Sequence, residues 1–73
     1  MPIVFSDHAE YQIKRRKISK KTVLKAVQHP DRIVPSYRGR RLRKMRIGDK
    51  MIEVVTKTEG SRITVVSAYY LED

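Results

Sequence analysis

The stretch YRGRRLRKMRIGDKMIEVVTKTEGSRITV, residues 37–65, decides the fold. Three glycine-containing turn signals divide it, at Arg38-Gly39, Gly48-Asp49 and Glu59-Gly60. Glycine supplies the positive φ that two-residue hairpin loops require, and a spacing of about ten residues suits short strands joined by tight turns. Neighbouring strands joined in this way must be antiparallel. Four strands are therefore predicted, over residues 31–37, 40–47, 50–58 and 61–70.

The residues before this stretch predict an edge strand and two helices. The apolar run PIVF at 2–5 predicts the strand. Ser6 or Asp7 can cap a first helix over about residues 8–17, and Ser19 can cap a second. His29-Pro30 ends the second helix, because proline disfavours helical geometry in the residue before it.

The expected fold class is therefore α+β, in the order βααββββ, as a single domain over residues 1–73. Two helices are expected to pack on one face of an antiparallel meander sheet. Ile18 and Val23 have the spacing of a hydrophobic staple around the Ser19 cap. The expected core consists of apolar residues at helical or alternating spacing, among them Val23, Leu24, Val27, Ile52, Val54, Ile63 and Val65.

Length and composition narrow the possible partners. A chain of 73 residues without cysteine builds one small core and contains no disulfide framework. It has no apolar run long enough for a membrane span and no opening signal peptide, so a soluble, cytoplasmic protein is expected. The net charge of +9 attracts polyanions. Nucleic acid is the first candidate, followed by an anionic membrane and an acidic protein.

The positive charge is clustered. Residues 14–25 hold seven Lys or Arg and residues 38–46 hold six more, without an acid in either run. From residue 47 to the end there are three bases and five acids. This asymmetry indicates a positive face with a purpose beyond solubility.

In the basic strand over residues 40–47, the apolar residues do not all fall on one face of the strand. Strict alternation places Leu42 on the face opposite to Met45 and Ile47, so we expect a β-bulge near Arg43-Lys44 that brings all three to the core. The basic side chains would then line the exposed sheet face, where arginine suits phosphate. A solvated edge that prevents sheet-to-sheet aggregation is the alternative. The expected RNA-binding residues are Tyr37, Arg40, Arg41, Arg43, Lys44, Arg46 and Lys57.

Few patterns point to a particular chemistry. There is no phosphate-binding glycine loop, paired-histidine zinc motif or supported Ser-His-Asp pattern, and the acids are scattered, so we expect no metal and no cofactor. His8 falls in the first turn of a helix, where the dipole disfavours the cation, and it could act as a base or be an ordinary surface histidine. His29 is expected to cap a helix end.

Tyrosines make up four of the five aromatic residues. Tyr69 and Tyr70 should point to opposite sheet faces. An exposed tyrosine among arginines could stack on an RNA base. It could also move a proton in metal-free RNA cleavage, in which the 2′-hydroxyl attacks the adjacent phosphate and cationic side chains stabilise the extra charge.

The segments FSDHAEYQIKRRKIS (5–19) and VVSAYY (65–70) resemble a small branch of the RelE/ParE toxin superfamily, often described only as a domain of unknown function. The matching positions are His8-Ala9, Arg16, Ile18-Ser19 and Val66-Ser67-Ala68-Tyr69. Two positions depart from the pattern: Gln12 stands where the branch often has Arg, and Lys17 where it often has Gly.

The resemblance implies a toxin of a toxin–antitoxin pair with a RelE/ParE-like fold. RelE-like members cleave mRNA, typically on the ribosome and without metal, and His8, Arg16 and Tyr69 are the catalytic residues that the resemblance implies here. We therefore expect a metal-independent mRNA endoribonuclease with a cognate acidic antitoxin as its protein partner. The alternatives are a non-catalytic RNA- or ribosome-binding module and a ParE-like toxin that inhibits DNA gyrase.

Overall fold

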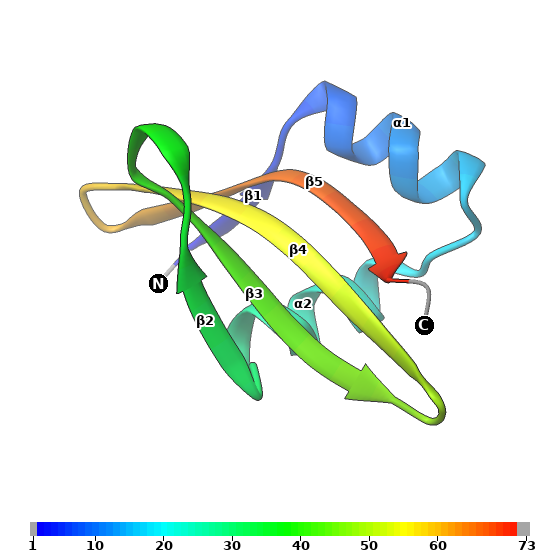
Figure 1. Cartoon of the computed structure of the whole chain (residues 1–73). Coiled ribbons are helices and arrows are strands. Elements are labelled where there is room, and N and C mark those ends of the chain that lie inside the picture. The colour runs from blue at the N-terminus through cyan, green and yellow to red at the C-terminus, as the bar shows by residue number, and fades with distance from the viewer. Residues whose placement is uncertain (1, 72–73) are drawn as a thin grey trace.

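The computed structural model describes residues 2–71, which form one five-stranded sheet and two helices (Figure 1). The expected βααββββ order is confirmed. The elements are β1 (Ile3–Phe5), α1 (Asp7–Arg15), α2 (Lys20–Gln28), β2 (Arg32–Pro35), the 3-10 turn η1 (Tyr37–Gly39), β3 (Arg40–Ile47), β4 (Lys50–Glu59) and β5 (Arg62–Leu71). No helix within the described residues is long and apolar enough to cross a membrane.

The sheet is mixed. Its strand order is β1-β5-β4-β3-β2, so β1 and β2 are the two edges. The meander from β2 to β5 is antiparallel, as the hairpin signals predict. The expectation of a wholly antiparallel sheet is wrong at β1, which pairs in parallel with β5. The two helices provide the crossover length that a parallel pair needs between its strands.

The two helices take different positions against the sheet. α2 packs on one face, against β3 and β4, and α1 lies along β5, beyond the point where β1 ends (Figure 1). Both helices bury their apolar stripes in a single core. The expected core residues are all buried except Leu24, which is half-buried.

Both helix starts are capped as the sequence predicts. The Ser6 hydroxyl accepts a hydrogen bond from the Ala9 N–H at 3.0 Å, which decides between Ser6 and Asp7 as the first cap. The Ser19 hydroxyl accepts from the Thr22 N–H at 3.1 Å. Each cap satisfies an amide that has no partner within its helix.

The end of α1 depends on one strained residue. Lys17 has φ of +57°, and the Ile18 N–H donates to the Ile13 carbonyl at 2.8 Å. This pattern is the Schellman ending, in which the left-handed residue is usually glycine. A lysine here retains the steric cost of its Cβ.

Replacing Lys17 with glycine should therefore stabilise the protein. The left-handed conformation costs a residue with a Cβ about 1–2 kcal/mol, and the extra chain entropy of glycine offsets part of that gain. We expect the free energy of unfolding in urea to rise by about 0.5–1 kcal/mol. Lys17→Ala is the matched control, because it removes the same charge and keeps the Cβ. Equal stability of the two variants would contradict the strain at Lys17.

The expected bulge in the basic strand is wrong. β3 and β4 pair without interruption from Arg40 opposite Lys57 to Ile47 opposite Lys50. Regular alternation leaves Leu42 on the face opposite to Met45, where it pairs with half-buried Val55. The register shift lies instead between β4 and β5.

The same alternation turns Arg43 toward α2, so its expected place on the exposed face is also wrong. Arg43 is only 9% exposed. Its Nη1 donates to the Val27 carbonyl at 3.0 Å and its Nε to Thr56 Oγ1 at 3.1 Å. Val27 lies in the last turn of α2, and carbonyls at the end of a helix carry partial negative charge and need partners from outside the helix. Burial lowers the pKa of the Arg43 guanidinium, and the charge of Arg41 lowers it further.

Candidate functional site

The sheet face turned away from α2, here called the open face, carries a row of three polar side chains at its centre. Lys44 of β3 lies opposite Glu53 of β4, and Glu53 lies opposite Tyr69 of β5. Their neighbours Ile52 and Val54 are fully buried beneath α2, so alternation places the polar row on the open face. Three strands thus each contribute one side chain.

Glu53 is the acid of this row, and it is only 6% exposed. Its Oε2 accepts a hydrogen bond from the Tyr69 hydroxyl, and its Oε1 lies 3.4 Å from Lys44 Nζ. A buried carboxylate is costly unless its oxygen atoms are paired, and here each oxygen has a partner. The network therefore fixes the position of the Tyr69 hydroxyl.

Arg16 brings a cation to the same tyrosine from the end of α1. Its Nη1 donates to the Ala68 carbonyl at 3.0 Å, which anchors the guanidinium against β5. Its Cζ lies 5.9 Å from the centroid of the Tyr69 ring, within the range of a cation–π contact. The side chain is otherwise exposed, so it can also meet an anion from solvent.

The surroundings of Tyr69 hold its proton firmly. Burial, the hydrogen bond to Glu53 and the charge of Glu53 raise the pKa of Tyr69 to about 12, and Arg16 opposes this rise. At neutral pH the phenol is therefore protonated and donates to Glu53. Its oxygen can still accept a hydrogen bond from a second group.

This raised pKa predicts a specific loss of stability in alkali. A tyrosine with a folded-state pKa of about 12 and an ordinary value of 10 binds its proton more tightly in the folded state. Its contribution to the free energy of unfolding is complete below pH 10 and is lost as the pH rises toward 12. The free energy of unfolding should therefore fall more steeply across this interval in the parent than in Tyr69→Phe. Parallel curves in urea titrations at several pH values would contradict the assignment.

Side chains of α1 lie at the edge of the site, next to β5. Gln12 accepts a hydrogen bond from the Ser67 hydroxyl of β5. His8 is exposed and lines a hollow along α1 with Gln12 and Arg16. A helix rises about 1.5 Å per residue, so His8 lies about 12 Å from Arg16 along the axis. The structure thus places Arg16 beside Tyr69, and His8 lies at the other end of the hollow that Arg16 lines.

The expected RNA-binding residues are distributed over three places. Lys44 belongs to the central row and Arg46 is exposed next to it along β3. Arg40 and Lys57 lie toward the other end of the open face, and Tyr37 lies in the turn η1 that leads into Arg40. Arg41 is exposed but alternates to the α2 side, as Arg43 does.

Glu53 is the site residue that sequence reasoning missed. A signal was present, because an acid between Ile52 and Val54 in an apolar strand occupies the alternate face, and the Gly48-Asp49 turn sets Glu53 opposite Lys44. No group of three or more His, Cys, Asp or Glu within residues 2–71 is placed to hold a metal ion.

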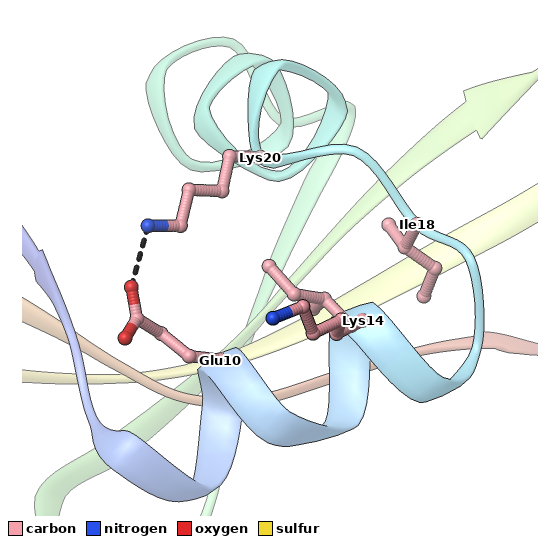
Figure 2. A pocket seen from close by; sticks show the side chains of 5 residues that line it. Glu10, Lys14, Ile18 and Lys20 are labelled. Carbon is pink, nitrogen blue, oxygen red and sulfur yellow. Dashed lines mark hydrogen bonds and ion pairs between the residues drawn. The ribbon is translucent and has the colours of Figure 1, made fainter.

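A separate hollow between the helices is structural in character. Figure 2 shows Glu10 of α1 directed toward Lys20 at the start of α2, with a 2.5 Å ion pair between them. Ile13, Lys14 and Ile18 complete the lining. The hydrogen bond and charge of Lys20 lower the pKa of Glu10. The ion pair in this hollow therefore links α1 to α2, and the residues that line the hollow contribute no group to the open face.

Comparison with known proteins identifies one family. The profile of the family described as a domain of unknown function, DUF4258, matches residues 5–70. No curated protein and no solved structure matches the chain. The matched segment runs from the last residue of β1 almost to the end of β5 and includes Arg16, Glu53 and Tyr69. The chain therefore belongs to the DUF4258 family.

Proposed function

We propose that the protein is a RelE-like toxin that cleaves mRNA on the ribosome without a metal ion. The observation that carries the proposal is the cluster of Arg16, Glu53 and Tyr69 on the open face. A hydroxyl held by a buried carboxylate, with an exposed guanidinium beside it, provides a proton acceptor and a phosphate ligand within one site.

The chemistry assigned to the cluster is transfer of the phosphate to the adjacent 2′-oxygen. The 2′-oxygen bonds to phosphorus, and the bond from phosphorus to the 5′-oxygen of the next nucleotide breaks. The phenol oxygen of Tyr69 takes the 2′-hydroxyl proton while its own proton passes to the Glu53 carboxylate. The leaving 5′-oxygen takes a proton from water, and the hydroxide that results takes back the proton held by Glu53. Arg16 stabilises the charge that develops on the phosphate oxygens.

The charge of the chain supports RNA as the substrate. The net charge is +9, and Arg40, Lys44 and Arg46 place three of the bases along the open face of β3. This charge would also attract the cognate acidic antitoxin that the toxin assignment requires. A non-catalytic RNA-binding module is the second candidate. It is favoured by the completeness of the Lys44–Glu53–Tyr69 pairing, which would also suit a purely structural network.

Cleavage of mRNA on programmed ribosomes, with and without a chelator, tests the proposal. We expect the parent protein to cut the message at the same rate in both conditions. An intact message in the presence of RNA binding would favour the binding module. An intact message without RNA binding, together with inhibition of DNA gyrase, would favour a ParE-like activity.

A further inference from the structure

A second positive group lies on the open face, away from the Tyr69 cluster. Arg40 of β3 and Lys57 of β4 are direct cross-strand partners. Like charges in this position destabilise a sheet. Neither residue has an ion-pair partner among residues 2–71. An anion between the two side chains would convert this repulsion into binding.

Arg40 also has an unsatisfied donor. Its Nε is buried and lacks a hydrogen-bond partner within the described part of the chain. Buried donors without partners are rare in folded proteins and costly to maintain. The guanidinium can satisfy this donor by turning outward to a phosphate, whose geometry its fork matches.

An exposed aromatic ring adjoins this pair. Tyr37 is 87% exposed, and its carbonyl accepts the backbone N–H of Arg40. The turn that carries Tyr37 holds Arg38 at φ +56°, a conformation that non-glycine residues rarely adopt. An exposed ring on the turn that leads into Arg40 is available for stacking by a single-stranded base.

We propose that Tyr37, Arg40 and Lys57 form a second subsite, here called the hairpin subsite, that binds single-stranded RNA beyond the cleaved phosphate. The proposal rests on the function proposed above. Lys57 lies four residues from Glu53 along β4, or about 13 Å. One phosphate cannot reach both places, so the bound RNA spans at least two phosphates. Leu42 and Val55, both half-buried, form the apolar row between the two places.

Binding of an uncleavable 2′-O-methyl RNA decamer to the intact protein tests the hairpin subsite. Arg40→Gln/Lys57→Gln should weaken the affinity several-fold and make the log–log salt dependence about 0.7 shallower, as loss of one phosphate contact requires. The charge-matched control is Lys21→Gln/Lys25→Gln on α2, on the other side of the sheet (Figure 1). The control should keep both the parent affinity and the parent slope.

Tyr37 separates stacking from charge in the same assay. Tyr37→Ala should weaken decamer binding by about five- to 150-fold, as loss of one stacked base does, and should leave the salt slope unchanged. Tyr37→Phe retains the ring and should bind as the parent does. Circular dichroism establishes that each variant is folded.

The outcomes distinguish the subsite from the proposed reaction. Subsite variants that bind the decamer as tightly as the Lys21/Lys25 control would overturn the subsite, whatever the cleavage rate. The same holds if the variants lose affinity for a polyglutamate peptide but not for RNA, which would make the surface a site for an acidic protein. A parent that binds through these residues but never cleaves mRNA would retain the subsite and refute the reaction.

Discussion

Tyr69→Phe should lower the single-turnover rate of mRNA cleavage by about 10²–10⁴-fold, the usual contribution of a group that transfers protons. The substitution keeps the ring that Arg16 covers and removes only the oxygen that, in the proposed reaction, passes the proton of the substrate to Glu53. RNA affinity should stay within a few-fold, because the cations of the open face are unchanged. Glu53→Gln should have an effect of the same order, since an amide cannot accept the proton that Tyr69 passes on.

Two control variants make this result specific. Tyr70→Phe is the same substitution at the next residue, which packs against the core on the opposite sheet face, and it should cleave at the parent rate. His8→Gln tests the exposed histidine that lies two helical turns from Arg16, and it should also remain within a few-fold. Parent-like cleavage by Tyr69→Phe, or an equal loss in Tyr70→Phe, would show that the tyrosine hydroxyl on the open face is not part of the reaction.

Arg43→Ala should destabilise the fold rather than weaken RNA binding. It removes a buried cation together with its two hydrogen bonds, and it leaves the Val27 carbonyl at the end of α2 without this donor. Losses of this kind cost about 2–4 kcal/mol. For a domain of this size the melting temperature should fall by roughly 10–30 °C.

Arg41→Ala is the matched control for Arg43. It removes the same charge two residues away, from an exposed side chain, so the free energy of unfolding should change by no more than about 0.5 kcal/mol. Thermal and urea unfolding measure both variants. An Arg43→Ala protein as stable as the parent but with a shallower salt dependence of RNA binding would return Arg43 to the RNA-contacting residues.

The elements of the fold were accessible from sequence because local chemistry determines them. The Ser6 and Ser19 caps and the glycine turns place the ends of the helices and strands within a few residues of the observed bounds. Parallel pairing of β1 was not accessible, because it depends on where the two helices return the chain. The hairpin spacing alone does not determine that position.

The candidate site depends on a register shift between β4 and β5, and no local sequence pattern predicts that shift. If β4 and β5 paired without a shift from the turn at Gly60-Ser61 onward, Glu53 would lie opposite Ala68 and Tyr69 would point toward α2. A shift at Val66, which has no partner in β4, moves Tyr69 opposite Glu53 instead. β1 ends beside Val65, and the Ser6 N–H donates to the Val65 carbonyl at 3.0 Å. Tertiary contacts at the start of α1 thus accompany the shift that assembles the site.

Alternation also explains why Arg43 was expected on the exposed sheet face although it is buried against α2. The sequence pattern favours apolar residues on the core face, so a bulge that placed Leu42 inside was the natural expectation. The structure places a cation inside instead, because the end of α2 offers a carbonyl acceptor and β4 offers the Thr56 hydroxyl. Such compensation depends on contacts between distant elements, and alternation within one strand does not reveal it.

The chemical ends of the cleaved RNA test the proposed reaction most directly. The parent protein, programmed ribosomes and a chelator are combined with an mRNA labelled on both sides of the cut. Attack by the 2′-oxygen predicts a 2′,3′-cyclic phosphate on the upstream fragment and a 5′-hydroxyl on the downstream fragment. A single 2′-deoxynucleotide at the cleaved position should abolish the cut. A 5′-phosphate product, or normal cleavage at the deoxynucleotide, would contradict the reaction assigned to Arg16, Glu53 and Tyr69.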